Sequence, residues 1–265
     1  MGSFNKQKAF GQHFLTEAGI IQGIVQATLQ TSRKYPKHSI LEIGPGKGAI
    51  TRTLLSTLPI DTPFFLAERD RDLIELWAGE SRVKKILKGD FLNQTDEELA
   101  ELGNFLVVSN LPYSAGTAIV VKLALMKQVP EMILMFQAEV AKRLYAEAST
   151  PDRGSLSLFI QNEWEVEKLM RVDPKAFNPP PKVMSEVVRL KRRETPLIPL
   201  HSQEERDEFD DLLKQSFKHR RKMLKGNLAG TKWQKGLELG GVNPSLRAEA
   251  LEWEDWIKIW THART

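Results

Sequence analysis

One stretch of the sequence, Ser39-Ile40-Leu41-Glu42-Ile43-Gly44-Pro45-Gly46-Lys47-Gly48, predicts both a fold class and a ligand site. Its first five residues predict a strand, three glycines follow at alternate positions, and the next residues have helical spacing. A strand, a glycine-rich loop and a helix form the first half of a nucleotide-binding βαβ unit. Glycines let the backbone approach a ligand closely, although glycine turns between strands and helices are also common.

The form of this loop narrows the class of ligand. A phosphate-binding loop requires Lys followed by Ser or Thr after its last glycine, whereas Ala49 and Ile50 follow Gly48. The dinucleotide fingerprint requires its third glycine one position beyond Gly48. The loop therefore fits a nucleoside-type ligand better than ATP or NAD.

Acidic residues follow the next two predicted strands. Glu68 comes directly after the apolar segment 64–67, and Asp90 follows the segment 83–87. Because ligands of open α/β sheets bind beyond the carboxyl ends of the strands, Glu68 is placed to bind ribose hydroxyls and Asp90 to accept an adenine amine. The alternatives are a surface acid beside Arg69 and a solvated turn aspartate.

The fourth predicted strand, 105–108, leads into Ser109-Asn110-Leu111-Pro112-Tyr113. The Asn110 side-chain carbonyl can accept a hydrogen bond from the amine of a planar base. Pro112 restricts Leu111 to an extended conformation, so that a main-chain carbonyl can be aimed at the same amine. The Tyr113 ring offers a stacking surface. The alternative is an ordinary turn after a core strand.

Strands that alternate with helices, followed by a late hairpin, predict an α/β fold with a mostly parallel sheet and an antiparallel edge. The predicted strands are 39–43, 64–67, 83–87, 105–108, 131–136, 166–172 and 186–190. The first helix is predicted at 17–29, with Thr16 as its N-cap. We expect residues 1–193 to form this domain and residues 200–265 a helical one, with a linker at 191–199.

The C-terminal part combines helical spacing with clustered positive charge. Apolar residues at 209, 212, 213 and 217 precede Lys218-His219-Arg220-Arg221-Lys222, and no acidic residue occurs from 212 to 236. Such uncompensated charge is typical of nucleic-acid binding, and the alternative is a solvated helix face. Further on, Asn243-Pro244 predicts a helix start. A second helix is predicted to place an apolar stripe in the core: Trp253, Trp256, Ile257 and Trp260.

The composition excludes several classes of protein. The 265 residues include no cysteine, which excludes disulfides and cysteine-ligated zinc and is compatible with a reducing cytoplasm. No apolar run reaches the roughly 18 residues of a membrane span, and the polar N-terminus lacks the apolar core of a signal peptide. The five histidines are scattered, so we expect no metal site. Nothing in the sequence demands more than a cytoplasmic monomer.

Six motifs occur in an order that resembles a known family. They are Gly11-Gln12-His13-Phe14-Leu15, Glu42-Ile43-Gly44-Pro45-Gly46, Glu68, Gly89-Asp90, Asn110-Leu111-Pro112-Tyr113 and Phe177-Asn178-Pro179-Pro180-Pro181-Lys182-Val183. The set resembles the ribosomal RNA adenine dimethyltransferases, which use S-adenosylmethionine to modify adenine N6. The basic segment 217–224 is similar to the basic helix of the bacterial small-subunit branch, the kasugamycin-sensitivity methylase. The resemblance covers essentially the whole chain, with His13 standing where the family usually has Asn.

The resemblance implies a Rossmann-like methyltransferase sheet with a small all-helical C-terminal domain. It implies that S-adenosylmethionine is bound by Gln12, His13, Leu15, Gly44, Gly46, Glu68, Asp90 and Asn110. The implied catalytic residues are Asn110, Leu111, Pro112 and Tyr113. Asn110 and the main chain at Leu111-Pro112 would accept the two N–H bonds of the target amine and aim its lone pair at the sulfonium methyl. The implied substrate contacts are Tyr113, Phe177, Arg220, Arg221 and Lys222.

The implied substrate is the small ribosomal subunit, at two adjacent adenines in a loop near the 3′ end of 16S rRNA. One alternative is a non-catalytic ribosome-assembly or RNA-binding factor, against which the intact Asn110 segment and Glu68 argue. Another is the antibiotic-resistance branch, which methylates a large-subunit adenine. The long basic C-terminal domain and Leu111 favour the small-subunit branch over it. The proline loop and the basic segment together disfavour DNA as the substrate.

Overall fold

The computed structural model describes residues 13–264, so the predicted cofactor contact Gln12 lies outside the described residues. The chain divides into two compact units. One comprises the chain up to Ala141 together with Val166–Arg192, and the other comprises Lys142–Glu165 with Arg193–Thr265. The predicted division at residue 193 therefore differs from the observed one at the segment Lys142–Glu165, which belongs to the C-terminal unit.

A seven-stranded sheet in the order β4-β3-β2-β5-β6-β9-β7 forms the framework of the first unit. Its strands are β2 (Ser39–Ile43), β3 (Phe64–Glu68), β4 (Val83–Lys88), β5 (Phe105–Asn110), β6 (Glu131–Gln137), β7 (Trp164–Val172) and β9 (Ser185–Arg192). The pairings from β4 to β6 are parallel, and β6 pairs with β9 antiparallel. The prediction of a mostly parallel sheet with an antiparallel edge is confirmed.

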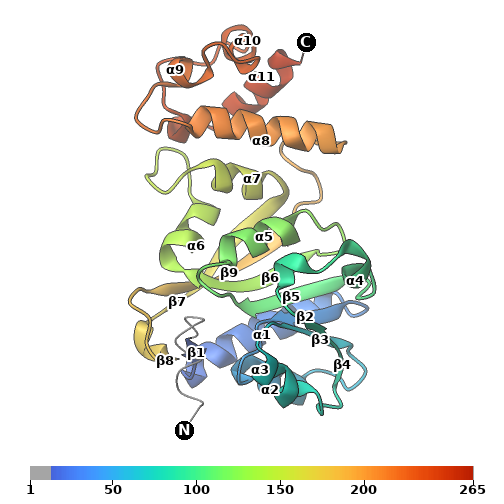
Figure 1. The fold of residues 1–265 in the computed structure, drawn as a ribbon. Coiled ribbons are helices and arrows are strands. Elements are labelled where there is room, and N and C mark those ends of the chain that lie inside the picture. The colour runs from blue at the N-terminus through green and yellow to red at the C-terminus, as the bar shows by residue number, and fades with distance from the viewer. Residues whose placement is uncertain (1–12, 265) are drawn as a thin grey trace. The chain divides into compact units, whose positions relative to one another are not determined.

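The central strands are buried along almost their whole length because helices cover both faces of the sheet. Every residue of β2 and β3 is buried, whereas the edge strand β4 is largely part-exposed. Figure 1 shows α1 (Ala18–Lys34) and α2 (Ala49–Thr57) on one side of the sheet and α5 (Gly116–Ala124) on the other. Ile24, Leu54 and Leu106 bring α1, α2 and β5 into one apolar core. The shorter helices are α3 (Arg71–Trp77), η1 (Phe91–Asn93), α4 (Asp96–Ala100) and η2 (Pro174–Ala176), and α6 (Ala138–Tyr145) follows β6.

A second, two-stranded sheet joins the start of the described chain to the proline loop. β1 (Phe14–Leu15) pairs antiparallel with β8 (Phe177–Asn178). This pairing corrects the predicted N-cap of α1: the Thr16 hydroxyl donates to the Ala176 carbonyl at 3.1 Å, and Glu17 caps the helix. The helix also runs on to Lys34, past the predicted end at residue 29.

The second unit is built from helices around its own apolar core. They are α7 (Ser155–Glu163), α8 (Gln203–Phe217), α9 (Leu224–Leu228), α10 (Trp233–Leu239), η3 (Ala248–Ala250) and α11 (Trp253–Ala263). Leu158 of α7 is fully buried in the same cluster as Phe209 of α8, which explains why α7 belongs to this unit. The predicted linker is also packed here, since the buried amide of Asn162 bonds both the N–H and the carbonyl of Ile198.

Three local predictions in this unit are wrong. The basic segment 218–222 is a loop between α8 and α9, because the Asn227 amide donates to the Ser216 and His219 carbonyls and ends α8. Asn243 and Pro244 form a turn whose carbonyl groups accept from the start of α9 and from the turn itself. Ile257 is 38% exposed, although Trp256 and Trp260 of the same predicted stripe are buried.

Candidate active site

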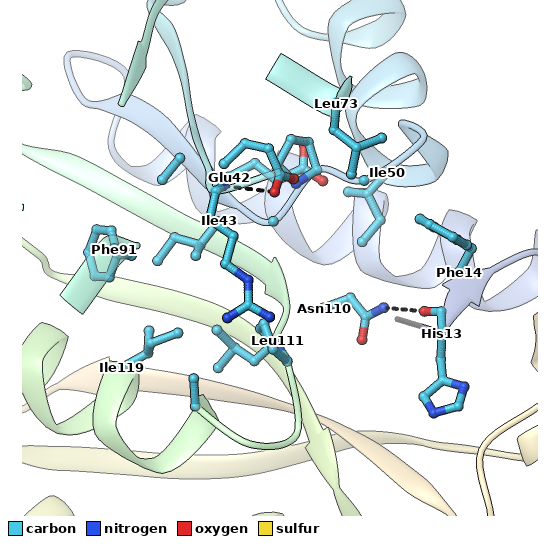
Figure 2. Close-up of a pocket in the computed structure, with 18 of the residues that line it drawn as sticks. His13, Phe14, Glu42, Ile43, Ile50, Leu73, Phe91, Asn110, Leu111 and Ile119 are labelled. Carbon is cyan, nitrogen blue, oxygen red and sulfur yellow. Dashed lines mark hydrogen bonds between the residues drawn. The ribbon is translucent and has the colours of Figure 1, made fainter. Parts of the chain in front are cut away.

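One pocket collects ten of the predicted site residues of the first unit (Figure 2). It opens at the carboxyl ends of β2, β3 and β5 and the turn after β4, where ligands of open α/β sheets bind. The ten residues are His13, Leu15, Gly44, Gly46, Glu68, Asp90, Asn110, Leu111, Pro112 and Tyr113. Five of the six sequence motifs therefore meet in one pocket, although they are spread over a hundred residues, and the proline loop 177–183 does not line it.

The glycine loop has space beside Gly44 but none beside Gly48. Gly44 has φ +69°, and a Cβ built there meets no atom of the described residues within 4 Å. Gly48 has φ +90°, and a Cβ there would lie 2.5 Å from the Trp77 ring. The Trp77 indole also donates to the Gly46 carbonyl at 3.0 Å. Trp77 thus fixes the loop, while the backbone at Gly44 stays accessible to a ligand.

Both predicted carboxylates use one oxygen to shape the turn after their strand. Oε1 of the buried Glu68 accepts from the N–H groups of Arg69 at 2.8 Å and Asp70 at 3.0 Å. Asp90 Oδ1 accepts from the Leu92 N–H at 3.0 Å. Burial raises the pKa of Glu68, and these backbone donors oppose that rise. Since a carboxylate has about four acceptor sites, both groups keep capacity for ligand hydroxyls or amines.

Glu42 is a pocket residue for which sequence reasoning assigned no role. Its side chain is 2% exposed, and its Oε2 has no hydrogen-bond partner among the described residues. Burial raises the pKa of Glu42 to about 8. The available signal was a lone acid inside the apolar strand 39–43, directly before the glycine loop. At neutral pH this carboxyl group is largely protonated.

Hydrogen bonds on both sides fix the end of β5, where Asn110 lies. The buried Ser109 hydroxyl donates to the Ile43 carbonyl at 2.5 Å, which ties β5 to the end of β2. The Leu111 N–H donates to the Met135 carbonyl at 3.2 Å, which ties the next residue to β6. Asn110 is therefore held in the middle of the sheet edge.

The main-chain acceptors beside Asn110 are not equivalent. The Pro112 carbonyl accepts from Ala115 N–H at 3.0 Å and Gly116 N–H at 2.9 Å, at the start of α5. Within residues 13–264, no group donates to the Leu111 carbonyl. Of the two carbonyl groups that the sequence offered as main-chain acceptors, the one of Leu111 is therefore the one available to a ligand.

The polar ends of Asn110 and Tyr113 are partly engaged within the protein. Asn110 Nδ2 donates to the His13 carbonyl at 3.4 Å, as the dashed line in Figure 2 shows. The Tyr113 hydroxyl bonds the Ser185 hydroxyl at 2.7 Å, and burial raises the pKa of Tyr113. The Tyr113 ring lies 5.6 Å from the His13 ring. These contacts leave the Asn110 oxygen and the face of Tyr113 as the groups that can meet a base.

Four of the predicted substrate contacts are not among the residues that line this pocket. Phe177 is 3% exposed in the core cluster and is not among the residues that line the pocket, so base stacking by Phe177 stays a prediction. In the C-terminal unit, Arg220 Nη2 donates to the carbonyls of Pro151 at 2.6 Å and Arg153 at 3.1 Å. The neighbouring Arg221 and Lys222 are exposed.

The described residues contain no group of three or more His, Asp or Glu side chains that could hold a metal ion. Among the same residues, no helix is long and apolar enough to cross a membrane.

Comparison with known proteins shows relatives that match nearly the whole chain. A family model described as "Ribosomal RNA adenine dimethylase" matches residues 3–264. "Ribosomal RNA small subunit methyltransferase A" of Chromobacterium violaceum is 38% identical over 263 residues, with 97% of this chain and 95% of that protein covered.

Two solved structures have the same fold. A dimethyladenosine transferase from Plasmodium falciparum is 23% identical, with a TM-score of 0.72 over 93% of this chain and 96% of its own. The 23S rRNA methyltransferase ErmE is 22% identical, with a TM-score of 0.66 over 95% of this chain and 100% of its own. With the family model matching nearly its entire length, this chain belongs to the ribosomal RNA adenine dimethylase family.

Proposed function

We propose that this enzyme transfers methyl groups from S-adenosylmethionine to the N6 amine of adenines in 16S rRNA of the small ribosomal subunit, two per adenine. The observation that carries the proposal is a pair of acceptors at the end of β5: the amide oxygen of Asn110 and the carbonyl of Leu111, to which no group within residues 13–264 donates. Both line the same pocket as the glycine loop. An amine with two N–H bonds is the group that such a pair suits.

The residues of the pocket fit the proposed cofactor. The space beside Gly44 admits a ligand against the backbone. We assign ribose hydroxyls to Glu68 and the cofactor adenine to Asp90, because each carboxylate keeps acceptor capacity after shaping its turn. Leu15 is buried and lines the pocket, where it can contact the apolar part of the ligand. When bound, S-adenosylmethionine supplies an electrophilic methyl group on a sulfonium.

The protein acts on the target amine by hydrogen bonding and orientation. An adenine amine is a poor nucleophile, because its lone pair is delocalised into the ring. When Asn110 Oδ1 and the Leu111 carbonyl accept hydrogen bonds from the two N–H groups of this amine, its nitrogen is drawn towards tetrahedral geometry. Tyr113 stacks on a base taken out of its stack in the RNA. Positioning and electrostatic complementarity then supply most of the rate.

The proposed substrate follows from the relatives and from the C-terminal unit. The relative at 38% identity is named as a small-subunit methyltransferase. Arg221 and Lys222 are exposed on a segment without acidic residues, which suits contact with RNA phosphates. We further propose that the protein works in the cytoplasm as a monomer.

The test is transfer of labelled methyl from S-adenosylmethionine to small and large ribosomal subunits that lack the modification. We expect dimethyladenine in the small subunit alone. Small subunits that already carry the modification are the control and should take up no label. Label in the large subunit would assign the enzyme to the resistance branch, and tight RNA binding without transfer would indicate an assembly factor.

A further inference from the structure

His13 connects two parts of the first unit that are far apart in sequence. Its carbonyl accepts a hydrogen bond from Asn110 Nδ2 at 3.4 Å, and its ring Nδ1 donates to the Pro179 carbonyl at 2.8 Å. Figure 2 shows the His13 ring directed away from the Asn110 side chain. The sequence placed this side chain against the cofactor, but its polar contact is with the proline loop.

The contact with the His13 carbonyl decides which end of the Asn110 amide is available. A primary amide has a donor end and an acceptor end of almost the same size. A carbonyl can bond only the NH2 end, so the His13 carbonyl leaves Oδ1 of Asn110 for the substrate. If the amide rotated by half a turn, it would present N–H groups to an amine, and the acceptor would be lost.

The position of this carbonyl depends on how the first strand is attached. β1 pairs with β8, and the Thr16 N–H donates to the Ala176 carbonyl at 2.8 Å. At the other end of β1, the His13 ring bonds Pro179. These contacts hold both ends of β1 against the same segment, so the His13 carbonyl has a defined position.

We propose that His13 is a positioning residue: its imidazole, bonded to the Pro179 carbonyl, holds the His13 carbonyl where it orients the Asn110 amide for the substrate amine. The inference rests on the proposed role of Asn110. For this role, residue 13 needs only a hydrogen-bond donor at the δ position of its side chain. Asn has its amide nitrogen at that position, Gln has it one bond further out, and Leu has the shape of Asn without a donor.

The experiment compares full-length His13→Leu, His13→Gln and His13→Asn. It measures kcat and KM for methyl transfer to unmodified small subunits, cofactor Kd by calorimetry, and melting temperature. We expect His13→Leu and His13→Gln to lower kcat by about tenfold with cofactor Kd unchanged, because an unfixed amide is only partly in its productive orientation. His13→Asn should restore kcat. In an Asn110→Ala background, His13→Leu should have no further effect on single-turnover rate.

The outcomes separate this inference from the proposed function. If the unchanged enzyme methylates no RNA, the proposed function fails first. If the unchanged enzyme is active and His13→Leu and His13→Gln keep its kcat, only the positioning role is refuted. A raised cofactor Kd at unchanged kcat would refute the positioning role and show that His13 contributes to cofactor binding instead. Should His13→Leu fold poorly, the pair His13→Gln and His13→Asn still decides, because both are polar and differ in where the nitrogen lies.

Discussion

The pocket at the sheet edge and the basic loop between α8 and α9 were both predicted from sequence motifs, and they differ in how far those predictions hold. At the sheet edge, Gly44, Glu68 and Asn110 line one pocket as expected. In the basic loop the expected helix is absent, and Arg220 bonds two main-chain carbonyls. Parallel strands dictate where their ends meet, whereas a run of like charges does not say which charge is free.

The sharpest test of the pocket is Asn110→Ala, for which we expect the largest effect. Loss of one of two acceptors for the amine should lower kcat by roughly 10³-fold, the upper range for removing one preorganised hydrogen-bonding group. Cofactor binding, measured by calorimetry, should persist because the glycine loop and Glu68 are untouched. An Asn110→Ala enzyme with normal turnover would contradict the reading of the pocket as an amine site.

Because Glu42 is buried in the pocket, we expect the free energy of unfolding to depend on pH. Its pKa is raised by burial from the ordinary 4.5 to about 8, so the folded state retains a proton that the unfolded state has released. Stability should therefore fall as pH rises between these two values. The contribution is roughly 1.4 kcal/mol per pH unit in this window.

The matched variant is Glu42→Gln, which removes the titration while keeping the shape of the side chain. Denaturant unfolding at pH 6, 7 and 8 should show that the free energy of unfolding of the variant increases relative to that of the unchanged protein as pH increases. Parallel stability profiles for the two proteins would mean that Glu42 does not titrate in this range.

Gly48→Ala tests whether the glycine loop is fixed by Trp77. A methyl group would lie 2.5 Å from the indole at φ +90°, so we expect a loss of about 2–3 kcal/mol in unfolding free energy. Gly44→Ala is the control, since position 44 shares the positive φ but a Cβ there meets no atom of residues 13–264 within 4 Å. It should cost about 1 kcal/mol and mainly weaken cofactor binding. Equal stability losses would show that Trp77 does not determine the loop.

The smallest effects are expected in the basic loop, where single exposed charges act. Arg220→Ala should lower the melting temperature, since it removes two hydrogen bonds to carbonyls, worth about 1 kcal/mol together after allowance for exposure. Arg221→Ala should leave the melting temperature unchanged and reduce the salt dependence of RNA binding by about one phosphate contact. The reverse pattern would exchange the roles of the two arginines.

How much the sequence could predict depends on the range of the interactions involved. Strands β2, β3 and β5 were predicted within one or two residues, because burial on both faces forces continuous apolar runs. The end of α8 was not predicted, because it is set by Asn227, which follows the helix and bonds back to it. The pairing of β1 with β8 was missed because two-residue strands have no periodicity.

The same limit applies within the site. Residue types at strand ends identified Glu68, Asp90 and Asn110. The difference between the Leu111 and Pro112 carbonyls could not be predicted, since it depends on where α5 begins. The direction of the His13 ring depends on Pro179, which is 166 residues away.

The contact between Gly48 and Trp77 also limits the order in which this loop can change during evolution. Any side chain at position 48 collides with the indole, so position 77 must become smaller first. That first step removes the N–H that bonds Gly46 and leaves a space in the core. Because each single change should be harmful alone, we expect positions 48 and 77 to change together, and a loop grafted from a relative should bring its residue 77 with it.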